Sequence, residues 1–467
     1  MYNENHSMTK HNNAVARWLG PILSDQSSSF AGAVRGRTLL LVLIIFVAAI
    51  SFRAAALYYW RAEVVTVQSG VANNYKLFAR LLMAEGLTGF FRSDSAMSNP
   101  DLLGHPPGYP MLLALIYSVV GEHDTFVQLV QIVADALAAL VIFLIVAELL
   151  NTIVAFIAGA LSSASPQFAW NSIMLLPDTL AVLPLLVAVY LLVRARRSSN
   201  ESLLLLAGLS IGLSCLLRPN ALLFAPFLFV VLLVSGYLSK MRRPRIAAVM
   251  LLIGAVTVIA PFTIRNALVL GRFVPLSLGA GQTLLEGIAD YDTQRRFGFA
   301  ETDVGIAKIE AESFGRPDYA DTLFGPDGIE RDRHRLRRGV QVIISQPMWF
   351  AGVMIQRAAS MLRMERVPLI SVDASRSTGY PLVLRGLQSI FITAVILPLS
   401  VLGILILALA RRWWALGILG LIPLYYFSVQ SALHTEYRYV LALYYSLFAY
   451  SAVTVWSIFK LVRGNVR

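Results

Sequence analysis

Charged side chains stand at the ends of long apolar runs, and these are the candidates for chemistry. Asp178 opens one apolar run and Arg265 closes another, while His434, Glu436 and Arg438 lie together in the segment HTEYRY between two more. A carboxylate can take a proton, and a guanidinium can bind an anion. A charge near hydrocarbon is costly and therefore a functional candidate, although helix ends also hold structural caps and anchors.

Composition shows what must position these side chains. The 467 residues are 57% hydrophobic and 14% charged, with a mean hydropathy of +0.67. This is more apolar surface than a soluble domain can bury, so the chain is predicted to be an integral membrane protein. Its net charge of +12 comes from clusters between apolar runs, which are typical of cytoplasmic loops rather than of nucleic-acid binding. Cys215 is the single cysteine, which excludes an intramolecular disulfide.

We expect an all-α polytopic fold of about ten membrane spans. Each apolar run approaches the roughly 20 residues that a helix needs to cross hydrocarbon. The runs are Thr38 to Tyr59, Phe126 to Leu149, Thr152 to Trp170, Pro177 to Val193, Ser202 to Leu217, Ala221 to Leu238, Ile246 to Ile264, Leu387 to Ala410, Trp413 to Ala432 and Tyr439 to Phe459. Residues 1–36 are polar and are predicted to form a cytoplasmic tail, with a short interfacial helix near 15–23.

Basic clusters orient these spans. The arginines of 194–197 and the cluster 240–245 should be cytoplasmic, as should both termini. Counting back from them puts the segment 60–121 outside, so Pro107 to Gly121 cannot cross and is predicted to be an interfacial helix. We expect residues 37–264 to form an N-terminal transmembrane module, 265–385 an outer segment, and 386–467 the last spans. Within the outer segment, 340–364 is expected to lie against the membrane.

Two further helical segments have specific predictions. Tyr75 to Phe91 is amphipathic, with Tyr75, Phe78, Leu82 and Met83 on one face. Asp135 and Glu148, inside or at the end of the second span, are interpreted as packing or helix-end residues. The same counting places the outward helix ends together, namely His105, Asp178, Arg218 to Asn220, Arg265 with Asn266, and 434–439.

In this order and on this side of the membrane, the motifs resemble those of the GT-C glycosyltransferases that use a polyprenyl-phosphate sugar. This superfamily contains protein O-mannosyltransferases and the aminoarabinose transferases of lipid A. The matching pieces run over nearly the whole chain from residue 38: YKLFARLL at 75–82, HPPGYP at 105–110, SP at 165–166 with LPD at 176–178, GLSCLLRPN at 212–220, PFTIRN at 261–266 and HTEYRY at 434–439.

The resemblance implies transfer of a sugar, with inversion, from a lipid carrier to an acceptor hydroxyl on the outer face of a bacterial inner membrane. The acceptor would be a glycolipid, a polysaccharide or a protein. Asp178 matches the acidic residue of the second outer loop, and His105, Arg265 and Arg438 are the candidates for binding the donor phosphate. Tyr109, Asn266, His434 and Glu436 are candidates for other substrate contacts. We expect no cofactor and no divalent metal.

One position departs from the family pattern. The acid expected three or four residues before Tyr75 is replaced by Val71 and Ala72. Three hypotheses follow: an acid of the same loop, Glu63, Asp94 or Asp101, acts as the base; Asp178 acts alone; or the protein binds its ligands without transfer. A transporter or flippase for lipid-linked saccharides, or a non-catalytic subunit, is the alternative function.

Overall fold

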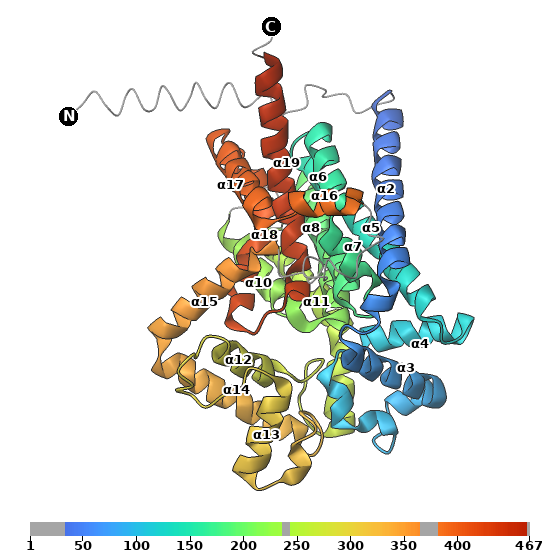
Figure 1. Ribbon diagram of the computed structural model, residues 1–467, viewed down its shortest axis with the longest axis vertical. Coiled ribbons are helices and arrows are strands. Elements are labelled where there is room, and N and C mark those ends of the chain that lie inside the picture. Colours follow the sequence, from blue (N-terminus) through green and yellow to red (C-terminus); the bar gives the residue numbers. More distant parts are fainter. Residues whose placement is uncertain (1–32, 236–242, 365–381, 465–467) are drawn as a thin grey trace, which may run out of the picture.

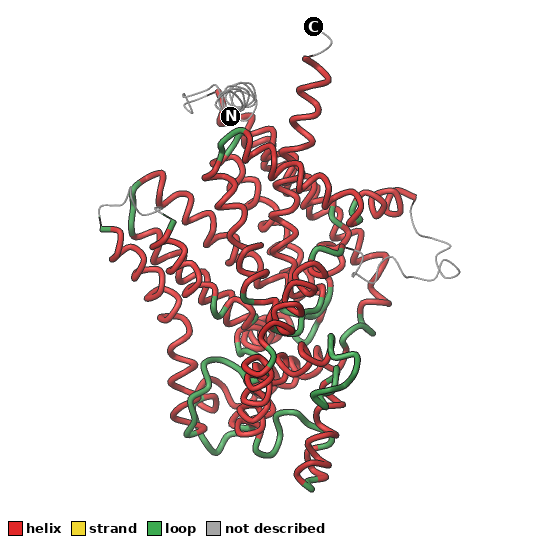
Figure 2. Tube along the Cα trace, turned by 90° about the vertical axis from the view of Figure 1, so that its left-hand side faces the viewer, coloured by secondary structure: helices red, strands yellow, loops and turns green. Residues whose placement is uncertain are grey.

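The computed structural model describes residues 33–235, 243–364 and 382–464, and within these ranges it contains helices and loops but no strand (Figure 2). Residues 1–32 of the predicted cytoplasmic tail, with its short interfacial helix, and part of the 240–245 basic cluster lie outside the described residues, and residues 33–36 begin the first helix. The all-helical fold class predicted from the sequence is confirmed for the described part of the chain.

Six of the described helices are long and apolar enough to cross a membrane. They are α2 (Ala33–Val64), α5 (Asp124–Leu149), α8 (Asp178–Ser198), α11 (Pro244–Leu270), α18 (Trp413–Ser428) with the short helix after it, and α19 (Leu441–Gly464) with the turn before it. Shorter apolar helices occupy three more predicted positions: α9 (Ser202–Leu217), α10 (Phe224–Val234) and α17 (Thr393–Leu409). The count of ten spans stays a prediction.

The predicted span from Thr152 to Trp170 is bent. It consists of α6 (Thr152–Ala164) and α7 (Pro166–Ile173), whose axes differ by 51°. Pro166 has no N–H to continue the helical hydrogen bonds, and the Ser165 hydroxyl caps the new helix by accepting from the Phe168 N–H at 3.4 Å. The pair is therefore a broken span or a re-entrant segment.

The predicted span from Leu387 to Ala410 is wrong at its start. Leu387 belongs to a separate helix, α16 (Leu382–Ile390), and α17 begins at Thr393. The Phe391 carbonyl accepts from Gln167 Nε2 at 2.8 Å, and the Thr393 hydroxyl accepts from the Met364 N–H at 2.8 Å. These tertiary hydrogen bonds engage the Phe391 backbone and the Thr393 side chain at the junction, which a sequence pattern cannot show.

The remaining helices gather at one end of the bundle, away from the C-terminus (Figure 1). They are α3 (Ser69–Phe90), α4 (Gly108–Val120), α12 (Ala280–Ala289), α13 (Asp303–Phe314), α14 (Gly328–Ser345) and α15 (Pro347–Met361). We call this the outer end. The short helix predicted at 107–121 is present as α4, and the predicted face of α3 is buried through Tyr75, Phe78 and Leu82, whereas Met83 is exposed.

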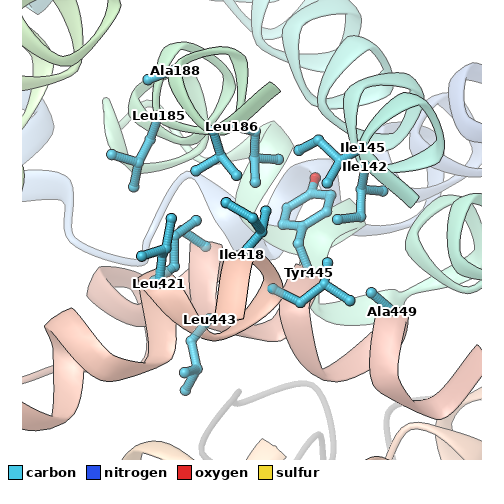
Figure 3. Close-up of a cluster of buried hydrophobic side chains, with 14 of the residues drawn as sticks. Ile142, Ile145, Leu185, Leu186, Ala188, Ile418, Leu421, Leu443, Tyr445 and Ala449 are labelled. Carbon is cyan, nitrogen blue, oxygen red and sulfur yellow. The ribbon is translucent and has the colours of Figure 1, made fainter. Parts of the chain in front are cut away.

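Between the outer end and the opposite end, the core is apolar. Figure 3 shows side chains of α5, α8, α18 and α19 interlocking around Tyr445. The Tyr445 hydroxyl donates to Asp135 Oδ1 at 2.8 Å, and Arg53 Nε donates to Asp135 Oδ2 at 2.6 Å. Because both carboxylate oxygens are engaged by α2 and α19, Asp135 joins three helices, which agrees with the packing role expected of it.

Candidate functional site

A buried ion pair joins the outer ends of α8 and α9. Asp178 is the first residue of α8, and Arg218 follows the last residue of α9, where Pro219 prevents the helix from continuing. Arg218 Nε donates to Asp178 Oδ1 at 2.8 Å, and Nη2 lies 2.7 Å from the same oxygen. The side chains are 13% and 3% exposed. Each charge therefore depends on the other to remain buried.

A second guanidinium approaches from the turn before α19. Arg438 donates from Nε and Nη2 to the two oxygens of Glu436, at 2.8 and 2.9 Å, and its side chain is 4% exposed. Tyr439 also donates to Glu436, at 3.2 Å, while its ring lies under Arg218 with 4.5 Å from Cζ to the ring centroid. This two-point grip holds the plane of Arg438 in one orientation.

Asp178, Arg218, Arg438 and Tyr439 line a cavity of about 30 Å³, which also touches Ser214, Asn220, Tyr425 and Tyr426. Among the buried polar atoms without a hydrogen-bond partner in the described part of the chain are Asp178 Oδ2 and Arg438 Nη1, whose residues line this cavity, and the hydroxyl oxygen of Tyr75. Leaving a buried polar atom unpaired costs about 1–3 kcal/mol. A carboxylate oxygen and two guanidinium groups facing one cavity are suited to a ligand that carries both a phosphate and a hydroxyl.

His105 lies beside this cavity, stacked on Tyr75 with 4.4 Å between ring centroids. Burial, with the charges of Arg218 and Arg438, lowers the pKa of His105 to about 3. Burial also raises the pKa of Tyr75 to about 12. Both rings are therefore neutral at physiological pH. The predicted contact of His105 with a phosphate would be a hydrogen bond from a neutral imidazole rather than an ion pair.

Arg265 and Asn266, predicted from the sequence as ligand-binding residues, hold the first outer loop instead. Arg265 Nε donates to the Phe90 carbonyl and Nη2 to the Met97 carbonyl, each at 2.8 Å, and Nη1 donates to Asn266 Oδ1 at 3.0 Å. Asn266 Nδ2 donates to the Val274 carbonyl at 3.0 Å. All three donor nitrogens of Arg265 are used by the protein, so this geometry is that of a structural clamp.

Replacing Arg265 with Ala is expected to lower the stability of the protein rather than its affinity for a donor. The change leaves two buried carbonyls without donors, each worth about 1–3 kcal/mol. Thermal unfolding of the purified variant measures the loss. Because Arg265→Lys can still satisfy one carbonyl, its melting temperature should lie between those of Arg265→Ala and the unmodified protein. An unchanged melting temperature together with weakened donor binding would contradict this assignment.

The three acids of the first outer loop do not reach the cavity. Glu63 is exposed in the last turn of α2. Asp94 is exposed and paired with Arg92, whose hydrogen bond holds the pKa of Asp94 below its usual value. Asp101 accepts from the Thr322 hydroxyl at 2.5 Å, which ties the loop to the outer segment. Of the four predicted carboxylates, Asp178 is the one that lines the cavity.

Tyr109 and His434 also have partners within the protein. The Tyr109 hydroxyl donates to Gln131 Oε1 at 2.8 Å inside the core. His434 Nδ1 lies 2.8 Å from Asp290 Oδ2, which joins the loop before Arg438 to α12. Burial alone would lower the pKa of His434, but the hydrogen bond and charge of Asp290 raise it. Their substrate contacts remain predictions.

Sequence reasoning noted Arg218 as an outward helix end but did not assign it to the site. One signal was present: a charge at the end of the 16-residue helix α9 lies close to hydrocarbon and needs a partner. Tyr75 and Tyr439 were missed as well, because nothing in an amphipathic pattern tells whether a buried hydroxyl meets the core or a cavity.

Glu286 of α12 gives a pH-dependent prediction. It is 6% exposed, and burial raises its pKa from 4.5 to about 7. The folded protein thus binds more protons than the unfolded chain between these values, so stability should fall as pH rises through this window and level off above it. At pH 8 the free energy of unfolding of Glu286→Gln is expected to exceed that of the unmodified protein by on the order of 3 kcal/mol, so the variant should unfold at a higher temperature.

At pH 5 the two proteins should be nearly equally stable, since Glu286 is then protonated. The raised pKa of His434 acts in the same direction and is retained in both proteins. Parallel stability curves between pH 5 and pH 8, measured by thermal unfolding, would show that Glu286 does not titrate in this range.

Comparisons with known proteins match part of the sequence and the fold. A family model described as dolichyl-phosphate-mannose-protein mannosyltransferase matches residues 104–264. These residues include His105, Asp178 and Arg218. No curated protein sequence matches the chain.

Solved structures similar to this chain include the archaeal oligosaccharyltransferase AglB of Archaeoglobus fulgidus. In complex with an inhibitory peptide and a dolichol-phosphate, it matches with a TM-score of 0.52 and 16% identity, over 91% of this chain and 51% of that one. Its apo form matches with a TM-score of 0.54 and 17% identity over the same shares. ArnT of Cupriavidus metallidurans, bound to undecaprenyl phosphate, matches with a TM-score of 0.36 and 14% identity, over 91% and 78%.

This chain spans about half the length of the oligosaccharyltransferase. The likeness to that protein, at this level of identity, establishes a shared fold. The family match covers the outer helix α4, both partners of the buried ion pair, and the spans between them. Over residues 104–264 the chain is therefore similar to the dolichyl-phosphate-mannose-protein mannosyltransferase family, and its fold is shared with the archaeal oligosaccharyltransferase.

Proposed function

We propose that this protein transfers a sugar from a polyprenyl-phosphate carrier to an acceptor hydroxyl, with inversion, at the cavity between Asp178, Arg218 and Arg438. The observation that carries the proposal is the buried carboxylate with one unpaired oxygen, facing a guanidinium with one unpaired nitrogen. The archaeal oligosaccharyltransferase, whose fold this chain shares, adds support because it has been solved in complex with a dolichol-phosphate.

In the proposed reaction the acceptor hydroxyl attacks the anomeric carbon from the side opposite the phosphate. Asp178 Oδ2 takes the hydroxyl proton, the new glycosidic bond forms, and the bond between the anomeric carbon and the phosphate oxygen breaks. The leaving group is the polyprenyl phosphate, whose developing charge Arg438 and Arg218 stabilise. In this proposal, neutral His105 and the Tyr75 hydroxyl donate hydrogen bonds to the same oxygens.

We further propose that the outer end faces the periplasm of a bacterial cell and that both termini are cytoplasmic. Arg194 and Arg197 pair with Glu148 at the end of α8 away from the cavity, and Arg196 stacks on Trp414 there at 3.8 Å. Positive charge at one end of a helix bundle marks the cytoplasmic side. Cysteine accessibility at an engineered site on α13, in intact cells, tests this orientation.

Reconstitution into vesicles with a polyprenyl-phosphate sugar and a candidate acceptor tests the function. Release of free polyprenyl phosphate, dependent on acceptor and unaffected by EDTA, is the expected result; loss of release with EDTA would show that a metal takes part. Movement of the labelled lipid across the bilayer without release would indicate a flippase. Binding without either would fit the replacement of the usual first-loop acid by Val71 and Ala72, and would mean a non-catalytic subunit.

A further inference from the structure

The junction of α14 and α15 exposes apolar side chains to an unusual degree. Ile344 near the end of α14 is 74% exposed, Met348 at the start of α15 is 84% exposed, and Ile355 farther along α15 is 71% exposed. The two helices are separated by Gln346, and Pro347 starts the second one. Large apolar side chains grouped in this way mark a surface that meets a partner or a membrane.

The exposed face of α14 is amphipathic along its length. Arg333, Arg337, Val340 and Ile344 recur at helical spacing, and all four are exposed. The opposite face packs on α12 through buried residues that include Arg335, Gly339 and Val342. The exposed face therefore has its arginines in the first part of the helix and its apolar side chains at the end. Arg337 and Ile344 are separated by about 10 Å along the axis.

α15 connects this junction to the membrane helices. Its buried face, with Phe350, Val353, Arg357 and Met361, lies toward the protein, and the helix contacts α18 and the short helix after it. Arg357 Nη1 donates to the Ser431 carbonyl at 2.6 Å. Met348 and Ile355, two turns apart, share the opposite face. Figure 1 shows α15 running from the end of α14 back to the bundle, so exposed apolar side chains continue from the junction toward the spans.

Aromatic and basic side chains flank the junction. Trp349 contacts Phe297 with 5.0 Å between ring centroids, and Arg296 lies 5.1 Å from the Trp349 ring. Arg338 lies 4.8 Å from the Phe299 ring. Tryptophan and arginine at the level of lipid headgroups, with apolar side chains just beyond them, are typical of segments that lie in a membrane interface.

We propose that the α14–α15 junction inserts into the bilayer surface on the outer side. Ile344 and Met348 enter the boundary of the acyl chains, and Arg333 and Arg337 bind the phosphates of anionic lipids. This would hold the outer segment, and with it the Asp290–His434 link to the loop of Arg438, at a constant height over the membrane.

Site-directed fluorescence tests the proposal. An environment-sensitive probe is attached to Met348→Cys in a Cys215→Ala background, and to Glu312→Cys on exposed α13 as the matched control. In phosphatidylcholine vesicles containing phosphatidylglycerol, we expect a quencher carried on the upper acyl chain to quench the probe at 348 several-fold more than the probe at 312. Aqueous iodide should show the reverse order.

The arginines are tested in the same vesicles. Arg333→Gln with Arg337→Gln should reduce lipid quenching at 348, and omission of phosphatidylglycerol should have the same effect on the protein that retains both arginines. Quenching at 348 by iodide alone would overturn the proposal. In a parallel sample of unlabelled Met348→Cys protein, oxidant-dependent formation of a disulfide between two chains, together with no lipid quenching of the labelled protein, would overturn it too, because the surface would then be covered by a second copy.

Discussion

Replacing Asp178 with Asn is expected to lower the rate of sugar transfer by about 10²–10⁴-fold, the usual contribution of a general base. The amide keeps the shape of the side chain, and its oxygen can still accept from Arg218, which now donates at 2.8 Å. It cannot take a proton from the acceptor. Removal of the negative charge also leaves Arg218 free to attract the donor phosphate, so donor affinity should stay the same or increase while turnover falls.

The three acids of the first outer loop provide matched controls. Glu63→Gln, Asp94→Asn and Asp101→Asn remove the same kind of charge at exposed positions outside the cavity. Each should change transfer by no more than a few-fold. Rates of polyprenyl phosphate release, with donor binding measured separately, show which of these carboxylates acts as the base. If Asp178→Asn retained normal turnover while one of the loop variants lost it, the base would lie in the first loop after all.

Arg438→Gln is expected to reduce kcat/KM for the lipid-linked donor by about 10²–10³-fold, the cost of removing one group that stabilises a leaving oxyanion. The Nη1 nitrogen of Arg438 is buried without a partner, and Glu436 holds the other two nitrogens. The side chain is therefore already oriented when the ligand arrives. Arg438→Lys retains the charge but not the two hydrogen bonds to Glu436. Its kcat/KM should lie between those of Arg438→Gln and the unmodified protein.

Binding of free polyprenyl phosphate, followed by isothermal calorimetry in detergent, checks the effect on the phosphate separately from the sugar. Arg265→Lys is the control for phosphate binding. Arg265 is also buried, but its nitrogens donate to backbone carbonyls rather than facing the cavity. Weak phosphate binding by Arg438→Gln and normal binding by Arg265→Lys is the expected pattern. Normal binding by the Arg438 variant would place the phosphate elsewhere.

The sequence predicted the secondary structure well wherever apolar length decided it. The short helix α4 was recognised because its run was too short to cross and because the basic clusters left no alternative, and the positions of most spans followed from their length alone. The prediction failed at 387–410, where hydrogen bonds from Gln167 and with Met364 separate α16 from α17. Such bonds join residues that are far apart in the chain, so no local pattern records them.

The candidate site residues were also predicted only in part from the sequence. The sequence pattern predicted Asp178 as a candidate base and gave Arg265 and Arg438 the same predicted role in binding the donor phosphate, since each is a charge at a helix end. Their geometry separates them: Arg265 meets the carbonyls of the first loop, while Asp178 and Arg438 meet at a cavity with Arg218. A difference of one helical turn in depth or rotation decides between these outcomes, and tertiary packing sets it.

The sequence by itself determined that this is a helical membrane protein, which helix ends share a side, and which superfamily it resembles, because hydropathy, charge and motif order are properties of the chain read along its length. The tertiary structure alone decided that Asp178 pairs with Arg218, that Arg438 has one free nitrogen, and that the first-loop acids stay outside. Those facts depend on contacts between helices distant in sequence, and only the folded packing brings such residues together.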